Sequence, residues 1–153
     1  MMKNEPKPYS TQEFLGKNYL MQYAPATYET PKYRRINLIR KGLPYSALAY
    51  FIKTSGLNQQ ELASILQVST RTVQRFNPQQ NLSPQVSEKL LALNDLYQQA
   101  HEALGGQGPS ITAWLRQPAK ALGNLTPLNL LDTFDGLQEV KNVLGRLEWG
   151  VYS

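Results

Sequence analysis

Cysteine is absent from this 153-residue sequence, and histidine occurs once, as His101. Without thiols the chain has no disulfide framework, cysteine nucleophile or cysteine metal site, and nothing indicates an oxidising compartment. A single histidine beside Glu102 on a predicted helix is typical of a solvated or packed residue. The glycines at 105, 106 and 108 do not form a phosphate-binding loop, because no strand is predicted before them. We therefore expect neither enzymatic activity nor a metal or other cofactor.

Long hydrophobic runs are also missing, since no stretch of about 18 apolar residues occurs. The N-terminal segment MMKNEPKPYS lacks the apolar centre of a signal peptide. A hydrophobic content of 41% is nevertheless sufficient to bury the core of one ordinary domain or two small ones. The sequence thus predicts a cytoplasmic protein without a membrane-spanning segment.

Positive charge is concentrated at the N-terminal end. Residues 1–41 carry eight Lys/Arg against three Asp/Glu, residues 42–81 carry three against one, and residues 82–153 carry five against seven. The three segments therefore have net charges of +5, +2 and −2, which add to the formal +5 of the chain. This asymmetry suits a protein whose first part meets phosphate and whose last part binds something else. A solvated, lysine-rich tail is the simpler alternative.

Residues 57–76, LNQQELASILQVSTRTVQRF, predict two short helices joined by a tight turn. Asn58 and Glu61 have the spacing of a capping box at the start of the first helix. A serine can cap the second helix, which needs Val73 and Phe76 for its buried side. Its other positions carry donors and acceptors suited to phosphates and base edges. We assign DNA binding to Ser69, Thr70, Arg71, Thr72, Gln74 and Arg75.

The apolar spacing of this segment resembles the helix-turn-helix of the Xre/lambda-repressor type, with small Ala63 where the two helices cross. That family usually has glycine in the turn, where a positive φ is favoured, and this chain has Gln67 instead. A plain helical hairpin in an all-α core would use the same apolar residues. The framework positions are Leu62, Leu66, Val68, Val73 and Phe76.

Helical patterns continue on both sides, and no segment alternates like a strand, so we predict an all-α fold. Residues 1–41 are interrupted by prolines and should form a basic arm, with room for a short helix near 11–23. Pro44 suits the first turn of a helix that runs to about residue 54, and a long helix should run from 83 to the glycine pair at 105 and 106. Later helix starts are expected at Ser110, at Thr126 with Pro127, and at Asp135 with Gln138.

The long helix carries apolar residues at alternating steps of four and three, which is a spacing of 3.5 residues. Such a seam is either a stripe on the chain's own core, which is the simpler interpretation, or a dimer interface. The seam consists of Val86, Leu90, Leu93, Tyr97, Ala100 and Leu104, and the apolar face of the last helix consists of Leu137, Val140, Val143, Leu144 and Leu147.

The C-terminal half is similar to the toxin-binding domain of the Xre/MbcA/ParS antitoxin family. The similarity is carried by LSPQVSEKLLALNDLY at 82–97, AWLRQPAKALGNLTPLNLLDT at 113–133 and EVKNVLGRLEWGVYS at 139–153. Together with the helix-turn-helix it covers about residues 42–153. The expected order is a basic arm at 1–41, a DNA-binding domain at 42–81 and a helical toxin-binding or dimerisation domain at 82–153.

This resemblance implies an antitoxin that neutralises a RES-domain toxin, which depletes NAD, and that represses its own operon by binding operator DNA. Antitoxins of this family close the toxin's active site with their extreme C-terminus. A tail of four residues reaches about 13 Å when extended, which is enough to enter a nucleotide cleft. The toxin-binding residues that the resemblance implies are Arg146, Glu148, Trp149, Gly150, Val151, Tyr152 and Ser153.

Other interpretations stay open at this point. A stand-alone helix-turn-helix regulator, whose C-terminal half serves dimerisation or ligand sensing, fits the same composition. So does an antitoxin whose helix-turn-helix is only a scaffold, given Gln67 in the turn. Without a toxin, the C-terminal residues would be an ordinary frayed helix end. Because operators are usually read by two recognition helices about one DNA turn apart, we expect a homodimer or a larger complex with the toxin.

Overall fold

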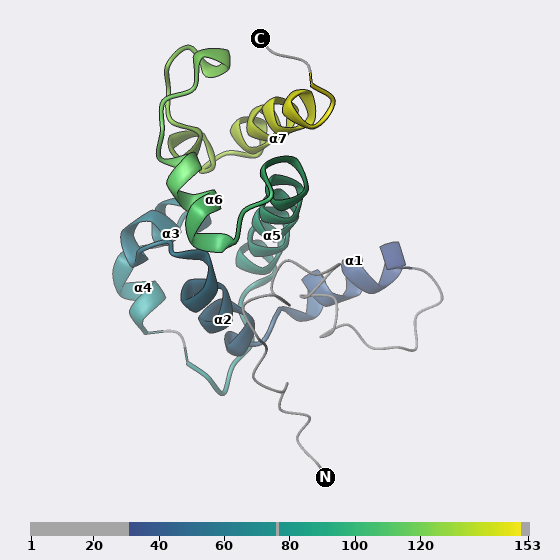
Figure 1. Ribbon diagram of the computed structural model, residues 1–153. Coiled ribbons are helices and arrows are strands. Elements are labelled where there is room, and N and C mark those ends of the chain that lie inside the picture. The colour runs from purple at the N-terminus through teal and green to yellow at the C-terminus, as the bar shows by residue number, and fades with distance from the viewer. Residues whose placement is uncertain (1–30, 76, 151–153) are drawn as a thin grey trace.

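The computed structural model describes residues 31–75 and 77–150, which are almost entirely helical and contain no β-strand (Figure 1). Two isolated β-bridges, Pro44 with Asn81 and Ala119 with Leu125, tie loops together in this part of the chain. The prediction of an all-α fold is confirmed. The elements are α1 (Pro31–Lys41), α2 (Tyr45–Ser55), α3 (Gln59–Leu66), α4 (Thr70–Gln74), α5 (Pro84–Leu104), α6 (Gly108–Leu115), the 3-10 helices η2 (Lys120–Leu122) and η3 (Pro127–Leu130), and α7 (Phe134–Glu148).

Helix α5 is the centre of the molecule and packs against α1, α3, α6 and α7 (Figure 1). Every seam residue from Val86 to Ala100 is buried, whereas Leu104 at the end of the helix is 38% exposed. The seam therefore belongs to the chain's own core and is not free to form a dimer. One hydrophobic cluster extends from Leu38 in α1 to Leu144 in α7, so the two predicted units share a single core.

Helix α1 occupies the end of the segment that the sequence predicted to be an arm. Pro31 is the first residue of the helix, a position where the missing backbone N–H of proline costs no hydrogen bond. From the sequence, the prolines of residues 1–41 were expected to interrupt regular structure, whereas this one begins a helix. Leu38 is 1% exposed, and Arg35 forms a 2.7 Å ion pair with Asp95 of α5. Residues 31–41 are thus part of the folded body. The short helix predicted near 11–23 lies outside the described residues.

Two of the predicted helix starts are wrong by two or three residues. Helix α6 begins at Gly108 with Gln107 at its N-cap, and Ser110 lies inside the helix, where its hydroxyl donates to the Gln107 carbonyl at 2.9 Å. Helix α7 is capped by Thr133, whose Oγ1 accepts from the Gly136 N–H at 3.0 Å, so Asp135 is in the first turn. The segment after Thr126 forms a 3-10 helix, and the Ser83 cap of α5 is confirmed.

A buried hydrogen-bond chain joins α2, α5 and α6. Tyr97 of α5 and Thr112 of α6 contact each other through their hydroxyls at 2.5 Å, and Thr112 also donates to the Ser55 carbonyl at the end of α2. Gly108 allows this approach, because a Cβ there would lie 2.1 Å from the Thr54 carbonyl oxygen. The start of α6 is therefore pressed directly onto the backbone of α2.

An exposed ion pair reinforces the same junction. Arg116, at the end of α6, donates from Nε and Nη2 to the two carboxylate oxygens of Glu61 at 2.8 and 2.9 Å, and Nη2 also reaches the Gly56 carbonyl. Hydrogen bonding from Arg116 holds the pKa of Glu61 below its usual value of 4.5, with a smaller contribution from the Asn58 N–H, while partial burial opposes the shift. The C-terminal unit is thus bonded to the first turn of α3.

We predict that Gly108→Ala destabilises the protein by about 2–3 kcal/mol, because α6 must move away from α2 to make room for the methyl group. Chemical denaturation followed by circular dichroism measures the change. Ser110→Ala, an exposed change in the same helix, is the matched control and should alter the free energy of unfolding by only about 0.5 kcal/mol. Equal stability of the two variants would contradict the assigned contact.

We also predict that Glu61→Gln flattens the dependence of stability on pH. Because the folded-state pKa of Glu61 is lowered, its contribution is present above the usual pKa and is lost as the pH falls through the folded-state pKa. The native protein should therefore lose more Tm than the variant between about pH 5 and pH 3. Glutamine can still accept the Asn58 N–H, so the capping box is retained. Parallel Tm curves for the two proteins would rule out this charge effect.

Candidate functional site

Helices α3 and α4 form the predicted helix-turn-helix. The Asn58 side chain accepts from the Glu61 N–H at 2.8 Å, and the Glu61 carboxylate accepts from the Asn58 N–H at 2.9 Å, so the capping box is confirmed. Gln67 in the turn has a left-handed backbone, with φ 58° and ψ 42°. Its side-chain amide donates to the Ser64 carbonyl at 2.8 Å. The turn therefore has the conformation for which glycine is usual, and Gln67 closes it with an extra hydrogen bond.

Helix α4 presents its polar residues to solvent. Ser69 caps the helix by accepting from the Thr72 N–H at 3.0 Å, and Val73, which is 2% exposed, anchors the helix to the core. Arg75 is the C-cap residue, so the helix is shorter than the sequence suggested, and Phe76 lies outside the described residues. Thr70 is half-buried, while the other five predicted DNA-binding residues, Ser69, Arg71, Thr72, Gln74 and Arg75, are exposed.

The exposed side of α4 borders a shallow cavity of about 370 Å³. Its lining contains two guanidinium groups and several hydroxyl and amide groups but no carboxylate, and among the described residues neither arginine forms an ion pair. Gln74 is steadied by a 2.9 Å hydrogen bond to Gln59 at the start of α3. A surface of this kind offers donors to phosphate oxygens and base edges. The lining residues are Ser69, Arg71, Thr72, Arg75, Asn77 and Gln80.

The second group of predicted site residues lies at the end of α7. Arg146 and Glu148 are in the last helical turn, and Trp149 at the C-cap is 83% exposed. Gly150 has a φ of +69°, which takes the chain out of the helix. Val151, Tyr152 and Ser153 lie outside the described residues. The structure thus places four of the seven residues together at one end of the molecule.

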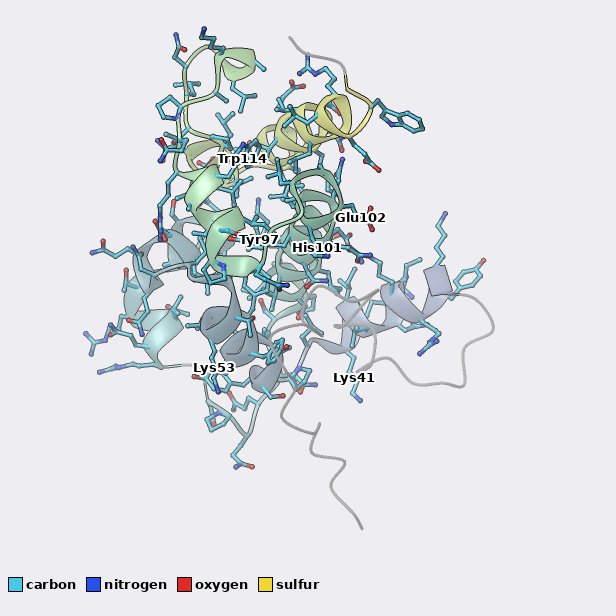
Figure 2. All side chains as sticks on the ribbon, in the orientation of Figure 1. Lys41, Lys53, Tyr97, His101, Glu102 and Trp114 are labelled. Carbon is cyan, nitrogen blue, oxygen red and sulfur yellow. The ribbon has the colours of Figure 1, made fainter. Side chains whose placement is uncertain are left out.

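Several other polar residues have structural roles. The Nδ1 atom of His101 lies 2.7 Å from the Gly106 carbonyl, at the loop that follows α5, and Figure 2 shows it on α5 close to Tyr97. Lys89, only 6% exposed, has its ammonium 4.6 Å from the centre of the Phe134 ring, and burial lowers its pKa while nearby Asp132 opposes the shift. No helix among the described residues is long and apolar enough to span a bilayer, and they contain no cluster suited to a metal ion.

This fold and the exposed second helix define an all-α protein with an N-terminal helix-turn-helix. Family models agree with that description: the antitoxin Xre-like helix-turn-helix domain matches residues 34–94, and the antitoxin Xre/MbcA/ParS C-terminal toxin-binding domain matches residues 99–150. The first match includes most of α1 and the first half of α5, beyond the 42–81 range expected from the sequence.

Characterised relatives lead to the same family. The Prs ADP-ribosylating antitoxin of Sphingobium sp. (strain YBL2) is 32% identical over 137 residues, which cover 84% of this chain and 86% of that protein. Antitoxin Xre of Yersinia enterocolitica is 35% identical over 71 residues, 46% of this chain and 48% of that protein. The chain belongs to the Xre/MbcA/ParS family of type II antitoxins and carries the family's toxin-binding domain.

A solved structure has the same fold. One chain in the crystal structure of the M. tuberculosis MbcT-MbcA toxin-antitoxin complex matches 71% of this chain and 96% of its own length, with a TM-score of 0.53. The two sequences are 22% identical, so the likeness concerns the arrangement of helices.

Sequence reasoning missed several residues near the exposed side of α4. Gln59 was not assigned, although it lies at the start of α3 and accepts a hydrogen bond from Gln74 at the end of α4. Asn77 and Gln80, which follow the second helix, were also not assigned, yet they line the cavity beside Arg71 and Arg75. The polar composition of NPQQN after the second helix was a usable signal for a surface in contact with phosphate.

Proposed function

We propose that this antitoxin binds a RES-domain toxin with its C-terminal unit, blocks the toxin's active site with residues 150–153, and represses its own operon through α4. One observation carries the proposal: a single hydrophobic core supports two separate surfaces, the polar exposed side of α4 and the end of α7. The exposed side of α4 and the end of α7 lie on different sides of the molecule (Figure 1). Each surface can therefore engage its own macromolecule.

The proposed toxin consumes NAD. The family resemblance implies NAD depletion, and the name of the Sphingobium relative refers to ADP-ribosylation, a reaction for which NAD is the donor. Gly150 releases the chain from α7, and the residues beyond it can extend about 3.3 Å each into a cleft. The aromatic ring of Tyr152 offers a flat, amphipathic surface for a nucleotide site. The chain itself acts as an inhibitor without catalytic activity.

Operator binding is supported by charge and geometry. Residues 42–81 carry a net charge of +2, and the cavity beside α4 presents Arg71 and Arg75 without a carboxylate. Two copies of α4 about 34 Å apart would read successive turns of the major groove. Because the α5 seam is buried in the chain's own core, the pairing of two copies must use another surface or the bound toxin.

The direct test is co-expression with the protein encoded next to this chain, which the proposal expects to be a RES-domain toxin. Cells that express the toxin alone should lose NAD and stop growing, and co-expression of the antitoxin should restore both. The two proteins should also co-purify as a complex that retards a DNA fragment from the upstream promoter. Continued NAD loss in the presence of the full chain would overturn the proposed function.

We predict that Arg71→Ala or Arg75→Ala weakens operator binding and leaves toxin neutralisation intact. If each arginine makes a bidentate contact to a base, the loss should be about 1–3 kcal/mol. Gel-shift titration at two salt concentrations measures it, because binding through phosphates weakens steeply with salt. Lys53→Ala is the control, because Lys53 is an exposed charge on α2 that is not among the residues lining the α4 cavity. Native affinity in both arginine variants would remove α4 from the DNA interface.

We further predict that a chain shortened after Trp149 still binds operator DNA but no longer protects growth. Tyr152→Ala should reduce protection in the same direction, because the ring is expected to fill the nucleotide cleft. A stand-alone transcription regulator would be insensitive to both changes. Full growth protection by the shortened chain would contradict the tail as the blocking element, whereas a stand-alone regulator would protect growth neither as the full chain nor as the shortened one.

A further inference from the structure

Helices α5 and α7 leave a groove of about 660 Å³ along one side of their contact, next to the C-terminal end of α7. Its lining contains two cations, three side-chain amides and an exposed indole, and no carboxylate. The groove is therefore locally positive, although residues 82–153 carry a net charge of −2. The lining residues are Gln99 from α5 and Gln138, Lys141, Asn142, Gly145, Arg146 and Trp149 from α7 and its cap.

Arg146 has an unsatisfied donor on the wall of this groove. Its Nε atom is buried and has no hydrogen-bond partner among the described residues. Because buried donors are nearly always paired in folded proteins, the unpaired Nε indicates that the chain does not hold the Arg146 guanidinium in place, so this group is available to turn toward an outside acceptor. Lys141, five residues earlier in α7, also lines the groove and forms no ion pair within the described part of the chain. Carboxylate and phosphate oxygens are the strongest acceptors for both groups, and of these two a protein partner supplies the carboxylate.

Gly145 gives a second, independent indication. It lies in the interior of α7, where glycine destabilises a helix relative to alanine. The chain itself does not require this glycine, because the nearest atom to an added Cβ would be Nε2 of Gln99, at an ordinary 3.7 Å. Gln99 in turn donates to the Lys141 carbonyl at 3.0 Å and fixes the base of the groove. A residue without a side chain at this position suits the close approach of a backbone from another molecule.

We propose that this groove receives an acidic segment of the toxin, whose carboxylate pairs with the Arg146 guanidinium and with Lys141 while its backbone passes over Gly145. This inference rests on the proposed function, because it takes the toxin as the partner. Trp149, 83% exposed at the groove's end, supplies the large aromatic contact that is common at the centre of protein interfaces. The groove contact is additional to the tail, since six of its seven residues precede Trp149.

The sharpest test is Gly145→Ala in the full chain. Alanine should raise the Tm by about 2–4 °C, because it favours the helix and meets no close contact. The same methyl group should weaken toxin binding at least tenfold in calorimetry, because it obstructs the incoming backbone. A more stable antitoxin that binds more weakly is the expected result, and a loss of folding cannot produce it.

Charge reversal tests the carboxylate. Lys141→Glu should weaken binding to the purified toxin at least tenfold, with a loss that shrinks as salt is added. Lys53→Glu makes the same charge change on α2, at the opposite end of the molecule from α7 (Figure 2), and should leave the affinity unchanged. Replacement of the interacting toxin carboxylate by lysine should restore binding to the Lys141→Glu chain.

The outcomes separate the two proposals. If the native chain binds and neutralises the toxin, and Gly145→Ala and Lys141→Glu do so with native affinity, the groove proposal is overturned and the antitoxin proposal stands. If the native chain does not bind the toxin, both fail. A crystal structure of the complex with a nucleotide phosphate on Arg146, in place of a toxin carboxylate, would also overturn the groove proposal.

Discussion

The burial of α5 is the constraint on which the rest of the structure depends. Leu90, Leu91 and Leu96 are at most 1% exposed although they point to different sides of the helix, which is the pattern of a helix enclosed by its neighbours. Truncation of one such side chain typically costs about 2–5 kcal/mol, against a total stability of about 5–15 kcal/mol for a domain. The helix-turn-helix and the C-terminal unit therefore cannot fold as independent bodies around it.

Local hydrogen bonding explains which helix boundaries could be predicted. The Asn58 and Glu61 pair and the Ser83 cap depend on residues within three positions of one another, and the structure contains both. The caps of α6 and α7 were placed too late, because Ser110 and Asp135 are good capping residues that happen to lie inside the first turn. Where several suitable residues are adjacent, tertiary packing selects the start, as the contact of Gly108 with the Thr54 carbonyl does for α6.

Contacts between distant segments explain what the sequence left out. Two ion pairs join residues that are far apart in the sequence: Arg35 with Asp95, 60 positions apart, and Arg116 with Glu61, 55 positions apart. No local sequence pattern predicts either pair. The same holds for the groove, where Gln99 meets Lys141 across 42 positions. The family resemblance implied a role for Arg146 and Trp149. The groove that these residues line exists only because α5 packs beside α7.

Short-range geometry must decide which surface the proposed toxin occupies. Attraction between exposed charges fades over about 8 Å at physiological salt, so an acidic partner is not guided selectively from a distance to the groove. The α4 surface is also positive, and on charge alone it would compete for the same partner. What distinguishes the groove is the unpaired guanidinium of Arg146 and the open space above Gly145, which together favour a carboxylate on a closely fitting backbone. DNA, whose phosphates are spaced along a wide rigid duplex, cannot enter such a groove, so the two partners can be sorted without any change in the fold.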